Sequence, residues 1–86
     1  MAAYKIIYRK SAVKALTKMS GKLAMQFTSA FLLLADHQES GLDIKKLEGR
    51  AGFRLRIGGY RAIYRRLNDT MVIDVINVGS RGDIYK

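Results

Sequence analysis

The chain has 86 residues, of which 49% are hydrophobic and 27% charged, and this composition indicates one small folded domain rather than a disordered protein. It has no Cys, which excludes a disulfide framework, thiol catalysis and a thiolate metal site, and its single His excludes a His-rich metal centre. With 16 Lys and Arg against 7 Asp and Glu, the net charge of +9 is typical of a protein that meets a polyanion or an acidic partner. We expect residues 1–86 to form a single domain that needs no metal and no cofactor.

The sequence shows no segment that would place the protein in a membrane. Its most apolar run, residues 31–35, is far shorter than the roughly 20 residues that span a bilayer. The first residues contain no apolar stretch of signal-peptide length. We therefore expect a cytoplasmic protein.

The first half of the chain predicts a strand followed by two helices. Residues 4–8 are β-branched and aromatic, as is typical of a short strand. A helix is predicted to begin at Ser11, whose hydroxyl can cap the first turn, and to end at residues 20–21. Apolar residues at helical spacing over 23–34 predict a second helix that stops near His37. The short turn between the two favours an antiparallel helical hairpin.

The second half predicts strands. Apolar residues alternate with Arg54 and Arg56, so these two arginines share the sheet face opposite the core. Gly58 and Gly59 fit a tight hairpin turn, and residues 79–83 are predicted to form a loop. The three predicted strands cover residues 53–57, 60–67 and 71–78. The fold class is therefore α+β, in the order β-α-α-β-β-β, with an antiparallel sheet and a helical hairpin packed on one face.

Arginine is concentrated in one part of the chain. Residues 50–66 contain six Arg and no Asp or Glu. The planar guanidinium matches phosphate oxygens two at a time, and a row of like charges along one sheet face is unfavourable unless an anion meets it. A solvated basic surface is the alternative, and the absence of acids in this stretch counts against it because an ordinary surface mixes signs.

Four stretches together resemble the RelE branch of the RelE/ParE toxin superfamily. They are Leu47-Glu48-Gly49, Phe53-Arg54-Leu55-Arg56, Gly59-Tyr60-Arg61-Ala62-Ile63-Tyr64 and Val78-Gly79-Ser80-Arg81-Gly82-Asp83-Ile84-Tyr85. The predicted order of elements agrees with that family, and the resemblance covers nearly the whole chain. It implies a toxin of a type II toxin–antitoxin system, a ribosome-dependent endoribonuclease that cleaves mRNA and so inhibits translation.

The resemblance also implies a set of site residues. In such toxins two basic residues on the second strand, an Arg on the third, an Arg in the loop after the fourth and a Tyr near the C-terminus line the active site. Carried over position by position, these are Arg54, Arg56, Arg61, Arg81 and Tyr85. The first two are usually Lys in the family, and Arg keeps the charge but changes the proton chemistry. We expect four further cations to extend the basic surface and to bind phosphates of RNA: Lys45, Lys46, Arg50 and Arg65.

Metal-free cleavage by the 2′-hydroxyl requires a base, an acid and cations that stabilise the phosphorane. The arginines supply the cations. Tyr85 is the better base, because surrounding arginines favour its phenolate, whereas His37 is expected to be an exposed residue at a helix end. The acid stays open: Arg81 or Arg61 can hydrogen-bond the leaving oxygen while water supplies the proton.

Two alternatives to the nuclease stay open. A ParE-like toxin shares the fold and inhibits DNA gyrase by binding, without nuclease activity, and the complete set of arginines with Tyr85 argues against it. A nonenzymatic RNA-binding domain fits the composition equally well, and only the spacing from Arg81 to Tyr85 argues against it. The expected partners are an acidic antitoxin in a toxin–antitoxin hetero-oligomer, the ribosome and mRNA, with no membrane.

Overall fold

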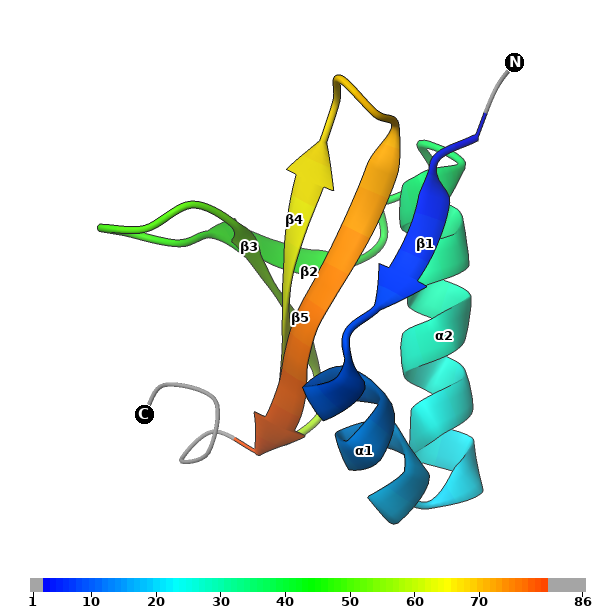
Figure 1. Ribbon diagram of the computed structural model, residues 1–86. Coiled ribbons are helices and arrows are strands. Elements are labelled where there is room, and N and C mark those ends of the chain that lie inside the picture. The colour runs from blue at the N-terminus through cyan, green and yellow to red at the C-terminus, as the bar shows by residue number, and fades with distance from the viewer. Residues whose placement is uncertain (1–2, 81–86) are drawn as a thin grey trace.

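Residues 3–80, which the computed structural model describes, form two helices and five strands. Along the chain these are β1 (Lys5–Tyr8), α1 (Lys10–Lys18), α2 (Gly21–Ala35), β2 (Asp43–Lys46), β3 (Phe53–Ile57), β4 (Tyr60–Leu67) and β5 (Val72–Ser80). The strands form one sheet in the order β1-β5-β4-β3-β2, and both helices lie on the same side of it (Figure 1). The predicted α+β fold with a helical hairpin on one sheet face is confirmed.

Two features of the sheet go beyond the predicted order. The strand β2 was not predicted, because its sequence Asp-Ile-Lys-Lys has only one apolar residue, and it exists through antiparallel pairing with β3. The strand β1 pairs with β5 in parallel, whereas all other neighbours are antiparallel. Parallel strands need a long connection between them, and here the two helices and the strands β2 to β4 lie between β1 and β5 in the chain.

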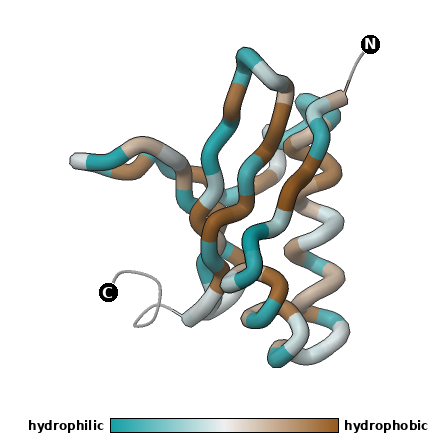
Figure 2. The backbone as a smooth tube through the Cα atoms, in the orientation of Figure 1, coloured by the Kyte–Doolittle hydropathy of each residue, from teal (hydrophilic) through white to brown (hydrophobic). Residues whose placement is uncertain are grey.

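The core lies between α2 and the sheet. The helix contributes Phe27, Phe31 and Leu34, which are fully buried. Phe31 meets Tyr8 and Tyr64 edge to face, with ring centroids 6.0 and 5.6 Å apart. Figure 2 shows hydrophobic residues in the elements that meet here, β1, β5 and α2. Burying each large apolar side chain stabilises the fold by about 1.5–3 kcal/mol, so this contact holds the helical hairpin on the sheet.

No helix within residues 3–80 is long and apolar enough to cross a membrane.

Serine side chains fix the helices in a way that differs from the prediction. Ser11 does not cap α1, which begins at Lys10. Instead, its hydroxyl donates a hydrogen bond of 2.7 Å to the carbonyl of Ile76 on β5. Ile76 is the extra residue of a β-bulge, because the register passes from Asn77 to Val75 without it. Ser20 is the N-cap residue of α2 rather than the end of α1, because its side chain accepts a hydrogen bond from the backbone N–H of Leu23 at 3.2 Å.

The strand β5 lies inside the sheet, between β1 and β4, and is longer than predicted. It continues through Gly79 and Ser80, which pair with Arg61 and Tyr60, so the predicted loop at residues 79–80 is wrong. The backbone ladder with β4 continues there and outweighs the low strand propensity of glycine. The predicted hairpin turn between β3 and β4 is confirmed, and Gly58 adopts the left-handed φ of +59°.

One buried acid connects the residue before α1 to β5. Asp74, on β5, is only 7% exposed. It accepts two hydrogen bonds from Arg9, from Nε at 3.1 Å and from Nη2 at 2.8 Å. Such a bidentate pair fixes direction as well as distance, so the junction between β1 and α1 is held against β5.

Candidate functional site

Three arginines and a lysine lie on the sheet face that is turned away from the helices. Arg56 is the direct cross-strand partner of Arg61, and Lys45 is the partner of Arg54. Directly paired residues point to the same face, and Leu55 between the two arginines of β3 points into the core. We call this set, together with Asp43, the arginine face: Asp43, Lys45, Arg54, Arg56 and Arg61.

Asp43 is the member that the sequence reasoning missed. Its Oδ1 lies 3.2 Å from Nη2 of Arg54, and its Oδ2 lies 2.9 Å from Nε of Arg56. The absence of acids from residues 50–66 therefore does not extend to the sheet face, where one acid from outside this stretch pairs with two of the arginines. Asp43 lies upstream of the arginine-rich stretch, on the strand that was not predicted, and only the pairing of β2 with β3 brings it beside the arginines.

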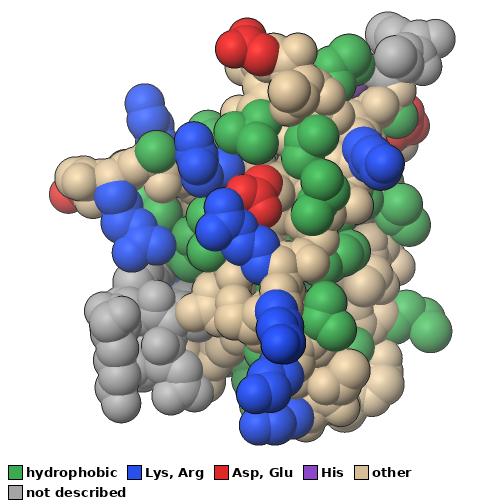
Figure 3. Space-filling view, in the orientation of Figure 1, with side chains coloured by type: hydrophobic (Ala, Val, Ile, Leu, Met, Phe, Trp, Pro, Cys, Tyr) green, Lys and Arg blue, Asp and Glu red, His purple; other side chains and the backbone are tan. Residues whose placement is uncertain are grey.

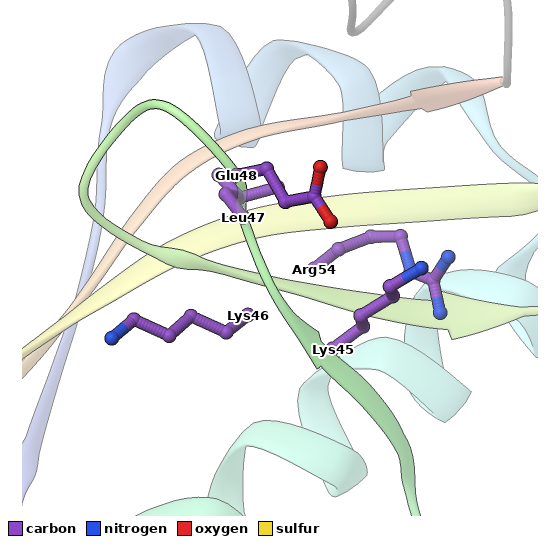
Figure 4. Close-up of a pocket in the computed structure, with 5 residues that line it drawn as sticks. All are labelled: Lys45, Lys46, Leu47, Glu48 and Arg54. Carbon is purple, nitrogen blue, oxygen red and sulfur yellow. The ribbon is translucent and has the colours of Figure 1, made fainter.

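A small cavity of about 220 Å³ adjoins Arg54 at the end of β2. Figure 4 shows the side chains of Lys45 and Arg54 converging on one region, with the carboxylate of Glu48 nearby, while Lys46 points in another direction. The Nε of Arg54 is buried and has no hydrogen-bond partner among the described residues. Arginine carries five N–H groups and Asp43 engages only Nη2 of Arg54, so other terminal N–H groups of this side chain are available to an anion.

The other predicted phosphate-binding residues lie apart from this face. Lys46 pairs with Phe53 and so belongs to the helix side of the sheet, while Arg50 is exposed in the loop between β2 and β3. Arg65 is exposed on the same sheet face as Arg61, but about 13 Å further along β4, from a rise of about 3.3 Å per residue. Arg66 points to the helix side, where its Nη2 lies 2.9 Å from Glu39.

Figure 3 shows how the basic side chains spread beyond the arginine face. Lys and Arg gather over the β2–β3 hairpin, over the sheet and along α1, with few acids among them. A surface of this kind attracts a polyanion over a wide area, and the arginine face offers several donors in one place.

Within the described residues, two tyrosines and His37 are side chains to consider as a base. Arg81 and Tyr85 lie outside the described residues. Burial raises the pKa of Tyr64 to about 12, partly opposed by the positive charge of Arg66, and burial also raises the pKa of Tyr8. Burial therefore disfavours the phenolate form of both tyrosines. His37 is exposed in the turn after α2, with its ring 5.3 Å from that of Tyr4 and on a different element from the arginines, as expected for a residue at a helix end.

Similarity to known proteins agrees with this arrangement. The sequence matches, over residues 6–85, the family described as the ParE toxin of the type II toxin–antitoxin system parDE. No curated protein sequence matches the chain.

Several solved structures share the fold. The archaeal RelE–RelB complex from Pyrococcus horikoshii OT3 has 28% identity and a TM-score of 0.78, with 94% of this chain and 98% of that chain covered. The RelB–RelE antitoxin–toxin complex from Methanococcus jannaschii has 27% identity and a TM-score of 0.76, with coverage of 92% and 94%. The intact Escherichia coli RelBE toxin–antitoxin complex, at 23% identity, has a TM-score of 0.75 and coverage of 91% and 96%, and it supports the fold alone.

The family match covers nearly the whole chain, and the structural matches cover the same elements. The chain therefore belongs to the RelE/ParE superfamily and is a toxin of a type II toxin–antitoxin system.

Proposed function

We propose that this toxin is a ribosome-dependent endoribonuclease that acts on mRNA in the cytoplasm. The observation that supports this most is the convergence of Arg54, Arg56 and Arg61 on one sheet face. A binding module needs positive charge, but a nuclease that works without a metal needs several donors around one phosphate. The arginine face meets that requirement with residues from two adjacent strands.

In the proposed reaction the 2′-hydroxyl attacks the neighbouring phosphorus, a new O–P bond forms, and the bond to the departing 5′-oxygen breaks. The arginine face stabilises the negative charge that develops on the phosphorane. Tyr85 takes the proton of the 2′-hydroxyl, Arg81 or Arg61 hydrogen-bonds the leaving 5′-oxygen, and water supplies the proton that this oxygen gains. The products are a 2′,3′-cyclic phosphate and a free 5′-hydroxyl.

A mapping experiment on translated mRNA tests this function. Purified toxin in an in-vitro translation reaction should produce cuts within the translated region, and a substrate with 2′-methoxy at the cut site should stay intact. Arg61→Ala should slow cleavage by about 10²–10³-fold, the usual effect of losing one such donor. The matched control is Lys14→Ala on α1, which removes the same charge from an exposed position away from the site and should cleave normally.

The second candidate is gyrase inhibition, because the matching family is described by its ParE members. It predicts that the wild-type protein blocks DNA supercoiling by gyrase and leaves mRNA intact. If the toxin inhibits supercoiling and cleaves no mRNA with or without ribosomes, the nuclease proposal is wrong.

We also propose that a cognate acidic antitoxin binds the toxin in a hetero-oligomer. The structurally similar proteins from P. horikoshii and M. jannaschii are RelE–RelB complexes. The net charge of +9 favours an acidic partner that covers the arginine face, so the complex should weaken as salt rises and should block cleavage. Titration of cleavage with the co-purified partner at two salt concentrations measures both effects.

A further inference from the structure

We propose that Asp43 is a positioning residue for the arginine face: it orients the guanidinium groups of Arg54 and Arg56 so that their remaining donors bind one phosphodiester of RNA. This inference rests on the proposed nuclease function and names a residue that the family resemblance does not supply. Asp43 is not itself placed against the substrate.

The contacts of Asp43 link both arginines through a single carboxylate. One oxygen accepts a hydrogen bond from Nη2 of Arg54 at 3.2 Å. The other oxygen forms an ion pair with Arg56, with 2.9 Å between it and Nε. Asp43 is the direct cross-strand partner of Arg56, while Arg54 is its diagonal neighbour. One carboxylate on β2 therefore holds two long side chains of β3 relative to each other, one by a charge-assisted hydrogen bond and the other by charge attraction.

The donors that Asp43 leaves unused are the ones that suit a phosphate. Arg56 is held through Nε, so its two terminal nitrogens remain for an end-on, bidentate contact with phosphate oxygens. Within residues 3–80, no other acid pairs with Arg56. The Arg56 side chain is 49% exposed, so without this contact little else restrains its orientation.

Arg54 is more buried than Arg56 and contacts Asp43 through a terminal nitrogen. Its side chain is only 17% exposed, its Nη2 is engaged by Asp43, and its Nε is buried without a partner among the described residues. It adjoins the cavity to which Lys45 also contributes (Figure 4). Lys46 and Glu48 also line this cavity, so its lining offers a phosphate three cations and one carboxylate.

Asp43 also balances charge before RNA arrives. Arg56 lies directly opposite Arg61, and like charges at that position repel each other. A carboxylate beside Arg56 reduces this repulsion and keeps the arginines side by side. If the carboxylate of Asp43 occupied the position of the phosphate instead, it would compete with RNA, and its removal would tighten RNA binding.

The test compares Asp43→Asn with Asp69→Asn. Both remove one negative charge, and Asp69 is exposed in the turn between β4 and β5, where no ion pair of the described residues includes it. Single-turnover cleavage on ribosomes and binding of a 2′-methoxy single-stranded RNA are measured for each variant. We expect Asp43→Asn to slow cleavage by about 10–100-fold, as for a small misplacement of catalytic groups, with RNA binding within about threefold of wild type. Asp43→Glu should recover part of the rate, and Asp69→Asn should change neither quantity.

Two results would overturn the proposal. If Asp43→Asn cleaves at the wild-type rate, the pair is an ordinary surface contact. If it binds RNA more tightly and cleaves faster, Asp43 occupies the phosphate position and inhibits the site.

A readout that is independent of cleavage separates this inference from the proposed function. In NMR spectra the Nε signal of Arg56 should shift between the wild type and Asp43→Asn, because the carboxylate 2.9 Å from this atom loses its charge, and 2′-methoxy RNA should shift the terminal nitrogens more than Nε. If the wild-type chain cleaves no mRNA, the nuclease function fails, and these signals still decide: an Nε–H signal that is unchanged in Asp43→Asn refutes the role of Asp43.

Discussion

Gly52 precedes β3 and is the position where a single methyl group should disturb the arginine face most directly. Its φ is +120°, a conformation that residues with a side chain rarely adopt. A Cβ atom there would lie 3.0 Å from the carbonyl oxygen of Tyr64 and 3.4 Å from Cδ1 of Leu47. The carbonyl belongs to β4 and cannot rotate away, so Gly52→Ala must displace the start of β3.

Two contributions set the size of the effect. Backbone strain at such a φ is about 1–3 kcal/mol, and forcing an atom into a close contact adds about 1–3 kcal/mol. We therefore expect Gly52→Ala to lower the free energy of unfolding by about 2–6 kcal/mol, from a total of about 4–13 kcal/mol for a domain of this size.

Urea unfolding of Gly52→Ala and Gly49→Ala tests this reasoning. Gly49 lies in the same loop with a φ of +74°, but a Cβ atom there has nothing within 4 Å. Its substitution should cost about 1–2 kcal/mol through strain alone. If Gly52→Ala is no more destabilising than Gly49→Ala, the close approach of the two backbones has no energetic weight and the reasoning fails.

Three further outcomes follow from the contacts described above. Phe31→Leu removes two edge-to-face contacts and should lower the free energy of unfolding by about 1–3 kcal/mol, measured by urea titration, whereas an unchanged midpoint would refute it. Ser20→Ala should cost about 1 kcal/mol in thermal unfolding and Ser20→Asn much less, because Asn also caps helices. The pKa of Tyr64 is raised to about 12, above the value near 10 in the unfolded chain, so its contribution to stability is full below pH 10 and is lost as the pH rises toward 12. Tyr64→Phe should therefore lose stability less steeply than wild type between pH 10 and 12, and equal slopes would contradict this.

The sequence predicted a strand, a turn and the helical hairpin correctly, because each depends on residues close together in the chain. The alternation over residues 53–57 gave a correct strand and placed Arg54 and Arg56 on one face, because side chains in a strand alternate by geometry. The turn at Gly58 was equally local, since it depends on one residue with a positive φ. The helical hairpin followed from the spacing of apolar residues along α2.

The features that sequence reasoning missed depend on partners far along the chain. The strand β2 has too few apolar residues to be recognised alone, so its pairing with β3, and with it the role of Asp43, was not predictable. Ser11 has the right residue type for a helix cap, but the bulge at Ile76 offers its hydroxyl a different partner. For the candidate site, the alternation of residues predicted which arginines share a face. Arg81 and Tyr85, the other two predicted site residues, lie outside the described part of the chain.

The parallel pairing of β1 with β5 has a consequence for the order of folding. The partner of Lys5 is Val72, and β5 is also the partner of β4, so the strand that joins β1 to the rest of the sheet comes last in the chain. A nascent chain that has emerged only as far as Leu67 holds β1 without any neighbour and leaves one edge of β4 open. Closing so long a loop slows folding, and exposed edges of this kind favour aggregation. The hydrogen bond from Arg9 to Asp74 also cannot form before β5 does. Pairing of this strand with β1 and β4 therefore joins the separate parts of the chain into one cooperatively folded unit.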